Sequence, residues 1–404
     1  MHIVFVSREY PPTNRGGGIA SYVRNMACYY ASLGHSVTVV AASDDTRSDS
    51  EIISEGVRII RLSGGDFLVP NEEGNNIFKK FRCLYRFHSY RRKIRSTILS
   101  LPKIDIIEVA EFGAEAYYLM DLQIPVVIRL HTPTILDRNT FARKHYPITK
   151  FYERWCASKE ERILKDAKYV TSCSISLKDW CVSNFKLDSE RIKVIYNPVH
   201  LNDWNISKAN SSTVTKGVNI LFAGTVAIDK GISDLVEACK LLRTSGENIW
   251  LTIAGKMGNY GISLKESLIN DNWCFFTGHI SHKELKELYK SHDIACFPSW
   301  WDNMPMVCIE AMATPMLTIG SKRGGMSEII EDGVDGFLIE PKRPADLAKK
   351  IREVHELPAE QKDAICKCAQ EKILEKFDLC NVGKQMLDNY ETIIKDFKNE
   401  NTLG

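Results

Sequence analysis

Two acidic residues, Asp302 and Glu310, stand on either side of the start of a predicted helix. Residues Asp293–Phe297 have the composition of a buried strand, and Pro298 with Ser299 marks the turn that follows it. A strand, a turn and a helix N-terminus favour anions, because the free backbone N–H groups and the helix dipole point the same way. Two carboxylates there suit sugar hydroxyls better than phosphate, because carboxylates accept hydrogen bonds. The segment predicts a site for a diphosphate with a sugar at each end, that is, a nucleotide-sugar.

A structural reading of the same two acids is also open. Asp302 would then cap the helix, and Glu310 would lie on a solvated helix face. From this segment alone the two readings are equally favoured. The choice between them depends on whether other segments of the chain carry matching phosphate-binding features.

Three consecutive glycines, Gly16, Gly17 and Gly18, come after the first predicted strand, His2–Ser7, and directly precede a predicted helix. Glycine lets backbone N–H groups approach an anion without a Cβ atom in the way. A dinucleotide-binding Rossmann loop would use the same chemistry. Its glycines, however, follow the strand at once in the pattern G-x-G-x-x-G, which is absent here.

The second half of the chain holds two more glycine turns before predicted helices. Gly224-Thr225 is followed by Lys230, and a second turn contains Gly324-Gly325. A lysine can reach a diphosphate as a point charge, so this arrangement also favours phosphate binding. Considered alone, Lys230 would be an ordinary solvated surface charge.

Taken in order, these segments resemble the retaining glycosyltransferases of family 4, also called glycosyl transferases group 1. The matching features are a Pro-Pro loop before the glycines, Gly-x5-Lys-Gly, an acid separated by seven residues from Glu-Ala-Met, and Gly-Gly-x-Ser-Glu. The resemblance implies an α/β chain of the GT-B fold, in which two Rossmann-like, doubly wound domains face each other across an interdomain cleft.

The resemblance also implies roles for single residues. Glu310 would hold the nucleotide ribose, Asp302 would contact the transferred sugar, and Gly18 would approach the donor phosphates. His131, at the end of the predicted strand Pro125–Leu130, would bind the transferred sugar rather than act as a general base. The candidate catalytic residues are therefore His131, Asp302 and Glu310. The donor-binding residues are Gly17, Gly18, Gly224, Thr225, Lys230, Asn303, Met304, Met306, Glu310, Gly324 and Gly325.

Two positions depart from the family pattern. The family usually has Glu where this chain has Asp302, and Arg where it has Thr225. A threonine donates one neutral hydrogen bond, which is weaker than a charged guanidinium fork. Lys322 and Arg323 are the candidates to supply the missing positive charge.

Short β-branched runs alternate with helical patterns along the whole chain, which predicts parallel sheets covered by helices. The polar stretch Asn202–Gly217 reads as a linker. We therefore expect residues 1–200 to form an acceptor domain and residues 201–378 a donor domain. By the resemblance, the last helix, about 379–404, returns to the first domain. The strands expected are His2–Ser7, Ser36–Ala41, Val57–Leu62, Ile104–Val109, Pro125–Leu130, Lys168–Thr171, Ile192–Tyr196, Val218–Ala223, Trp250–Ala254, Cys274–Thr277, Asp293–Phe297 and Pro315–Ile319.

Composition limits the remaining possibilities. The chain has 53 Lys and Arg against 51 Asp and Glu, so no global charge favours nucleic acid, and no nucleic-acid partner is expected. There is no D-x-D pair and no His/Cys set at ligand spacing, so we expect neither a metal nor another cofactor. No signal peptide precedes the first strand and no apolar run is long enough to span a bilayer, which predicts a cytoplasmic protein.

One basic stretch, residues 78–95, has eight Lys or Arg residues and no acid. Apolar residues recur in it at nearly helical spacing, so it could lie on the inner face of an anionic membrane. An ordinary domain helix packed on a sheet is an equally favoured reading. The basic residues of the membrane reading are Lys79, Lys80, Arg82, Arg86, Arg91 and Arg92.

The sequence and the resemblance together predict a retaining, metal-independent glycosyltransferase. It would move a sugar from a nucleotide-diphosphate sugar to a hydroxyl of a sugar or lipid-linked acceptor, in surface polysaccharide or glycolipid assembly. Two alternatives stay open. One is another GT-B nucleotide-sugar enzyme, such as an epimerase, and the other is a non-catalytic sugar-nucleotide binding module.

Overall fold

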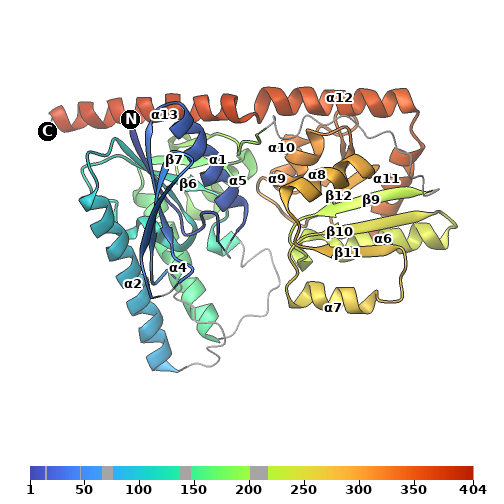
Figure 1. Ribbon diagram of the computed structural model, residues 1–404, viewed down its shortest axis with the longest axis horizontal. Coiled ribbons are helices and arrows are strands. Elements are labelled where there is room, and N and C mark those ends of the chain that lie inside the picture. The colour runs from blue at the N-terminus through green and yellow to red at the C-terminus, as the bar shows by residue number, and fades with distance from the viewer. Residues whose placement is uncertain (14–15, 46, 66–75, 137–146, 201–216, 404) are drawn as a thin grey trace. The chain divides into compact units, whose positions relative to one another are not determined.

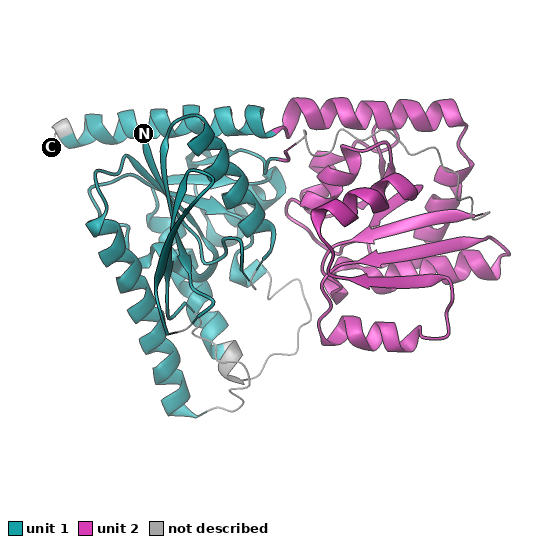
Figure 2. Cartoon of the chain, in the orientation of Figure 1, with its two compact units in different colours: residues 1–198, 379–404 teal, residues 199–378 magenta. Residues whose placement is uncertain are grey.

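The structure is a computed structural model that describes residues 1–13, 16–45, 47–65, 76–136, 147–200 and 217–403. The chain divides into two units (Figure 2). Unit 1 comprises Met1–Pro198 and Leu379–Gly404, and unit 2 comprises Val199–Asp378. Residues 202–216 of the expected linker lie outside the described residues.

Unit 1 is built on one sheet in the order β3-β4-β2-β1-β5-β6-β7-β8 (Figure 1). All neighbouring strands are parallel except β3 and β4, which are antiparallel. The strands are β1 (His2–Val6), β2 (Ser36–Ala42), β3 (Ser50–Ser54), β4 (Val57–Leu62), β5 (Ile106–Ala110), β6 (Val126–Leu130), β7 (Tyr169–Ser172) and β8 (Ile192–Val194). The central strands β1, β5 and β6 are buried over their whole length, which explains their continuous apolar sequences.

β3 was not expected from the sequence. All five of its residues are exposed, because it is an edge strand that pairs with β4 through backbone hydrogen bonds. A strand with no buried face carries neither an apolar run nor a clear alternation, so its composition gives no strand signal.

The helices of unit 1 follow its strands and include the end of the chain. They are α1 (Gly18–Ser32), α2 (Ile77–Ser100), α4 (Pro147–Asp166), α5 (Ile175–Phe185) and α13 (Leu379–Leu403), with 3-10 helices η1 (Phe112–Tyr118) and η2 (Ser189–Arg191). α1 and α13 share one hydrophobic core with β1, β2 and β4. α2 and α4 contact each other and the η1 segment that follows β5.

Unit 2 holds a parallel sheet in the order β11-β10-β9-β12-β13-β14. Its strands are β9 (Val218–Ala223), β10 (Ile249–Ala254), β11 (Cys274–Gly278), β12 (Ile294–Phe297), β13 (Leu317–Ser321) and β14 (Phe337–Ile339). Its helices are η4 (Ile228–Lys230), α6 (Ile232–Thr244), α7 (Asn259–Ser267), α8 (His282–Ser291), α9 (Met306–Met312), α10 (Met326–Ile329), α11 (Pro344–Glu356) and α12 (Ala359–Lys376). Because β9, β12 and β13 are neighbours, the loops at their carboxyl ends meet at one edge of the sheet, where ligands of such sheets bind.

Candidate functional site

Three loops of unit 2 converge after β9, β12 and β13. The Lys230 Nζ atom lies 2.5 Å from the Asp302 Oδ2 atom, which joins the first two loops. The Gly325 N–H donates to the Asp302 carbonyl oxygen at 2.8 Å, which joins the second and third. The structure therefore brings together Lys230, Asp302, Gly324 and Gly325, which lie up to 95 positions apart in sequence.

Glycine is required at two points of this convergence. Gly231 has φ +66°, and a Cβ atom there would overlap the Pro298 carbonyl oxygen. Gly324 has φ +75°, and a Cβ atom there would overlap the Asp302 carbonyl oxygen. Both backbones thus adopt a conformation that favours glycine and approach the β12 loop more closely than any side chain allows.

Glu310 lies in α9 with only 6% of its surface exposed. Burial raises the pKa of its carboxyl to about 7, and the nearby positive charge of Lys286 opposes that shift. The solvated-face reading of Glu310 is therefore wrong. The capping reading of Asp302 is wrong as well, because Pro305 is the N-cap residue of α9.

The other predicted donor residues occupy the same loops. Asn303 and Met304 are buried, and the Asn303 side-chain oxygen accepts the Trp301 indole N–H at 2.7 Å. Met306 is the first residue of α9, and Thr225 is exposed directly after Gly224. Arg323 lies 3.5 Å from Glu340, so one of the two candidate replacement cations forms an ion pair of its own.

The glycine loop of unit 1 ends at the start of α1. Gly17 is the extended N-cap residue of this helix and Gly18 is its first residue, and both are exposed. Gly17 has no side chain that could accept one of the first backbone N–H groups of α1. A helix N-terminus of this kind favours an anion.

His131 follows β6 and is 5% exposed. Its ring meets the Tyr22 ring edge-on, with 5.1 Å between the centroids. Burial, together with the charge of Arg129, lowers the pKa of the His131 imidazole well below its usual value. The ring is therefore neutral at physiological pH, and a neutral ring can donate one hydrogen bond and accept another.

Sequence reasoning missed three buried glutamates near His131. Glu111, Glu115 and Glu160 are each no more than 2% exposed. Their hydrogen-bond partners are backbone groups of other loops, which no local pattern reveals. The available signal was the acidic spacing of Glu108, Glu111 and Glu115 in and after a strand with an apolar sequence.

The predicted membrane patch needs one correction. Arg91 is fully buried, and its guanidinium donates to the carbonyl oxygens of Ala114 and Phe87, each at 2.9 Å. It belongs to the interior of unit 1 and cannot face a membrane. Figure 1 shows α2 as one long helix. The five other basic residues of the patch, Lys79, Lys80, Arg82, Arg86 and Arg92, are partly or fully exposed.

Different parts of α2 match the two interpretations of this helix, as an ordinary domain helix and as a membrane-binding helix. Its later part packs inward through Phe87, Tyr90 and Ile94, as an ordinary domain helix does. Its first two turns leave large apolar side chains in solvent, with Phe78 78% exposed and Phe81 63% exposed.

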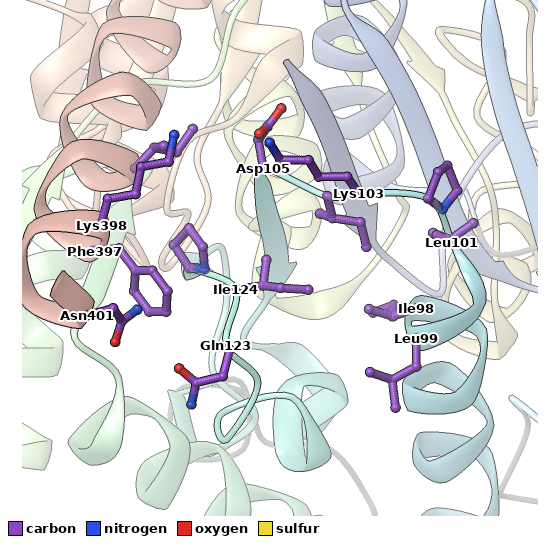
Figure 3. A pocket seen from close by; sticks show the side chains of 14 residues that line it. Ile98, Leu99, Leu101, Lys103, Asp105, Gln123, Ile124, Phe397, Lys398 and Asn401 are labelled. Carbon is purple, nitrogen blue, oxygen red and sulfur yellow. The ribbon is translucent and has the colours of Figure 1, made fainter. Parts of the chain in front are cut away.

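A cavity of about 690 Å³ lies at the end of the unit 1 sheet that is opposite the carboxyl ends of its parallel strands (Figure 3). Leu99 of α2, Ile124 before β6 and Phe397 of α13 are among its lining residues, and none of the predicted site residues is. The cavity is next to the amino ends of β5 and β6, whereas ligands of such sheets bind at the carboxyl ends. We assign it no part in the site.

Within the residues that the structure describes, no three His, Cys, Asp or Glu side chains are grouped so that they could hold a metal ion. Among the described helices, none combines the length and the apolar character needed to cross a bilayer.

Comparison with known proteins identifies the class of this chain. The sequence profile of the glycosyl transferases group 1 family matches residues 205–372, and that of glycosyltransferase family 4 matches residues 16–203. Two parallel-sheet Rossmann-like units with these matches define a glycosyltransferase of the GT-B fold. The chain belongs to the group 1 glycosyltransferases, and it is a transferase enzyme.

Similar proteins cover nearly the whole chain. Glycogen synthase of Mycobacterium tuberculosis is 25% identical over 94% of this chain and 91% of its own length. D-inositol 3-phosphate glycosyltransferase of Paenarthrobacter aurescens is 27% identical over 86% of each chain. Among solved structures, sucrose-phosphate synthase of Thermosynechococcus elongatus has a TM-score of 0.81 at 19% identity and covers 98% of this chain and 99% of its own. Anabaena HepE in complex with UDP-glucose has a TM-score of 0.72 at 18% identity and covers 97% of this chain and 100% of its own.

Proposed function

We propose that this chain is a retaining, metal-independent glycosyltransferase that moves a sugar from a nucleotide-diphosphate sugar to a hydroxyl acceptor in polysaccharide or glycolipid assembly. The observation that carries the proposal is the convergence of Lys230, Asp302 and the Gly324-Gly325 turn in unit 2. It supplies one cation and one carboxylate, which match a diphosphate and a hydroxyl of a sugar. The structure of HepE with UDP-glucose supports the same class of donor.

The residues take complementary roles in this proposal. Glu310 accepts hydrogen bonds from the ribose hydroxyls, and Asp302 accepts one from the transferred sugar. Lys230 stabilises the charge that develops on the departing diphosphate. In the proposed reaction this cation takes the place of a metal ion.

Transfer with retention forms the new bond on the face from which the diphosphate leaves. The bond from the sugar C1 atom to the phosphate oxygen breaks, and a bond from C1 to the acceptor oxygen forms. The departing phosphate oxygen takes the acceptor proton, so the step needs no side-chain base. A neutral His131 fits this scheme, since it binds a sugar hydroxyl without removing a proton.

An activity screen tests the proposal. Purified protein is incubated with UDP-, GDP- and ADP-sugars and candidate acceptors, with and without EDTA, and the anomeric configuration of the product is determined by NMR. We expect transfer that survives EDTA and retains the donor configuration, and Glu310→Ala should lower kcat/KM by at least a hundredfold. Full activity in Glu310→Ala would refute the assigned role of Glu310.

The same screen separates the two alternatives. An epimerase would convert the donor sugar in the absence of any acceptor. A binding module would bind the nucleotide-sugar and yield neither transfer nor slow hydrolysis.

We further propose that the start of α2 places the enzyme on an anionic membrane surface. The exposed apolar residues Ile77, Phe78, Phe81 and Tyr85 lie among Lys79, Lys80, Arg82 and Arg86. Each basic residue near such a surface contributes on the order of 1 kcal/mol of binding free energy. Phe78→Ser with Phe81→Ser should abolish co-sedimentation with phosphatidylglycerol vesicles. Leu99→Ser, an exposed apolar change at the other end of α2, should leave it intact, and equal binding of both variants would exclude this surface.

A further inference from the structure

Buried carboxylates connect the loops that follow β1, β5 and β6 in unit 1. Glu111, directly after β5, accepts the His131 N–H at 2.9 Å on both of its oxygens and also accepts the Thr132 N–H. The loop that carries His131 is therefore attached to the end of β5 through one side chain.

Other buried side chains hold the loop that carries Glu111. Glu160 of α4 accepts the Gly113 N–H at 2.7 Å and the Thr134 N–H at 2.8 Å. Arg91 of α2 donates to the Ala114 carbonyl oxygen at 2.9 Å and also to that of Gly113. The Glu115 carboxylate accepts the Arg8 N–H at 3.1 Å, which joins the same loop to the end of β1. Four ionisable side chains thus fix three loops at the ligand-binding edge of the sheet.

The backbone of this loop is strained. Gly113 has φ +78°, and Ala114 has φ +54° and ψ +44°, a left-handed conformation that costs a non-glycine residue roughly 1–2 kcal/mol. Such a conformation persists only where surrounding contacts impose it, and it concentrates at functional sites. Here the contacts come from Arg91 and Glu160, so the strain is imposed by the same groups that hold the loop.

Burying these carboxyls is costly, which argues against a purely structural role. Loss of hydration raises the pKa of Glu111 to about 8, although the backbone N–H groups of His131 and Thr132 oppose the shift. Loss of hydration also raises the pKa of Glu115 to about 7, against the opposing charges of Arg8 and Arg91. Apolar residues of similar volume usually stabilise an interior at least as well as buried charges. Costly titratable groups that gather at the ligand edge of a sheet are typical of functional sites.

We propose that Glu111 is a positioning residue for sugar transfer: it holds the backbone of His131 and Thr132, and through it the His131 ring, in the geometry that transfer requires. The inference rests on the proposed function, in which His131 contacts the transferred sugar. Glu160 and Arg91 act one step further away, because they fix the loop from which Glu111 reaches the end of β6. Misplacement of a contact group by about 1 Å lowers a rate on the order of a hundredfold.

The first test compares Glu111→Gln and Glu111→Ala with the wild type. Gln keeps one acceptor oxygen for the His131 and Thr132 amides, whereas Ala keeps none. We expect kcat to fall roughly tenfold in Glu111→Gln and on the order of a hundredfold in Glu111→Ala. The affinity for UDP, GDP or ADP, whichever the wild type binds most tightly, should change by less than twofold. Wild-type kcat in Glu111→Gln, or a parallel loss of nucleotide affinity, would overturn the proposal.

Asp105→Asn is the matched control. The Asp105 carboxylate accepts the His2 N–H at 2.7 Å, so it makes the same kind of bond just before β5, at the opposite edge of the same sheet. Its loss should lower the melting temperature and leave kcat unchanged. A similar fall of kcat in Asp105→Asn would mean that Glu111 acts only through the stability of unit 1.

Two further measurements separate this inference from the proposed function. In a His131→Ala background, Glu111→Gln should cost less than twofold in kcat, because the group that it positions is gone; a full additional loss would show that Glu111 acts elsewhere. Amide hydrogen exchange at His131 and Thr132 should be at least tenfold faster in Glu111→Gln and unchanged in Asp105→Asn. Equal exchange in all variants would exclude the attachment. If the wild type transfers no sugar, the proposed function fails, and the exchange rates still decide whether Glu111 holds His131.

Discussion

At the scale of single residues, Lys230 and Asp302 carry two functions that oppose each other. Their 2.5 Å ion pair is partly buried, with 28% and 18% of the side chains exposed. In the proposed function, a diphosphate competes with Asp302 for the Lys230 ammonium, whereas the transferred sugar uses the Asp302 carboxylate. The same acid therefore weakens the binding of the phosphates and strengthens the contact with the sugar.

This opposition predicts that Asp302→Asn changes nucleotide binding and turnover in opposite directions. The affinity for a nucleoside diphosphate should rise severalfold, because Lys230 is no longer neutralised. The kcat for transfer should fall at least tenfold. Isothermal titration and steady-state kinetics measure the two quantities. Asp335→Asn breaks a Lys–Asp pair of the same length, to Lys372, and should change neither. A parallel decrease of affinity and kcat in Asp302→Asn would contradict the competition.

Glu310 predicts a pH dependence of donor binding. With its pKa raised to about 7 by burial, the group is protonated below that pH and ionised above it. A carboxylate accepts ribose hydroxyls more strongly than a carboxylic acid does. Donor affinity should therefore increase as the pH rises from 6 to 8, and in Glu310→Gln it should be flat over that range. An intact nucleotide-sugar is the proper probe, because both of its phosphates are esterified and do not titrate near neutrality.

The same raised pKa of Glu310 has the opposite effect on the stability of the fold. The folded state keeps the Glu310 proton up to about pH 7, whereas the unfolded chain releases it near pH 4.5. Between these two values the folded state binds more protons, so this group's contribution to the free energy of unfolding decreases as the pH rises. An increase of donor affinity over the same range would therefore not reflect a more stable fold.

The residue scale also shows where sequence reasoning stops. The spacing of Asp302 and Glu310 and the Gly-x5-Lys-Gly turn predicted loops between a strand and a helix, and the structure has them, because each motif is local to one such turn. Glu111 could not be found in this way, since its partner His131 is 20 positions distant and contributes a backbone N–H, which every residue except proline has. Arg91 was misassigned because a buried and an exposed arginine look alike in a basic helix.

At the scale of elements, the predicted strands that supply the site loops are all present, since each is a buried apolar run bounded by turn residues. The missed strands, β3 and β14, are edge strands of five and three residues. Their pairing depends on a neighbouring strand rather than on their own composition. β3 belongs to the sheet of unit 1, and β14 pairs with β13 at the edge of the unit 2 sheet. The loops after β9, β12 and β13 could be predicted without either strand.

The close approach of the β12 and β13 loops predicts a large effect for Gly324→Ala. The new Cβ atom would overlap the Asp302 carbonyl oxygen and push the two loops apart. We expect nucleoside diphosphate affinity to fall at least tenfold. Gly333→Ala is the control, because Gly333 has φ +81° and no atom within 4 Å of the added Cβ. Gly333→Ala should lower the free energy of unfolding by about 1 kcal/mol, through left-handed backbone strain alone, and leave nucleotide affinity unchanged. Equal effects in both variants would mean that strain, and not the overlap, matters.

At the scale of the whole molecule, the chain leaves unit 1 after Pro198 and returns to it with α13. α13 presents Val382, Met386 and Tyr390 to the core that it shares with α1 and the sheet. These residues recur every four positions, which is the spacing of one helix face. The last helix therefore belongs to the fold of unit 1, even though 180 residues of unit 2 separate it from the rest of that unit.

Tyr390 provides the most specific test of this attachment. Its hydroxyl donates to the Glu108 Oε2 atom at 2.6 Å, and both side chains are buried. Tyr390→Phe leaves a buried carboxylate without this donor, which should cost about 1–3 kcal/mol of unfolding free energy. Tyr85→Phe makes the same chemical change at a residue that is 73% exposed, and it should change stability by no more than about 0.5 kcal/mol.

The readout has to distinguish the two units, because a chain with two units need not unfold in one step. A nucleoside diphosphate stabilises the unit that binds it by about 2.7 kcal/mol at a concentration of 100 times Kd. The unfolding transition that shifts when the nucleotide is added is therefore that of the unit with the nucleotide site. Tyr390→Phe should lower the melting temperature of unit 1, whereas nucleotide affinity stays within twofold of the wild type, since the Lys230, Asp302 and Gly324-Gly325 loops belong to unit 2. Loss of nucleotide affinity together with stability would show that α13 supports the donor site as well as the core of unit 1.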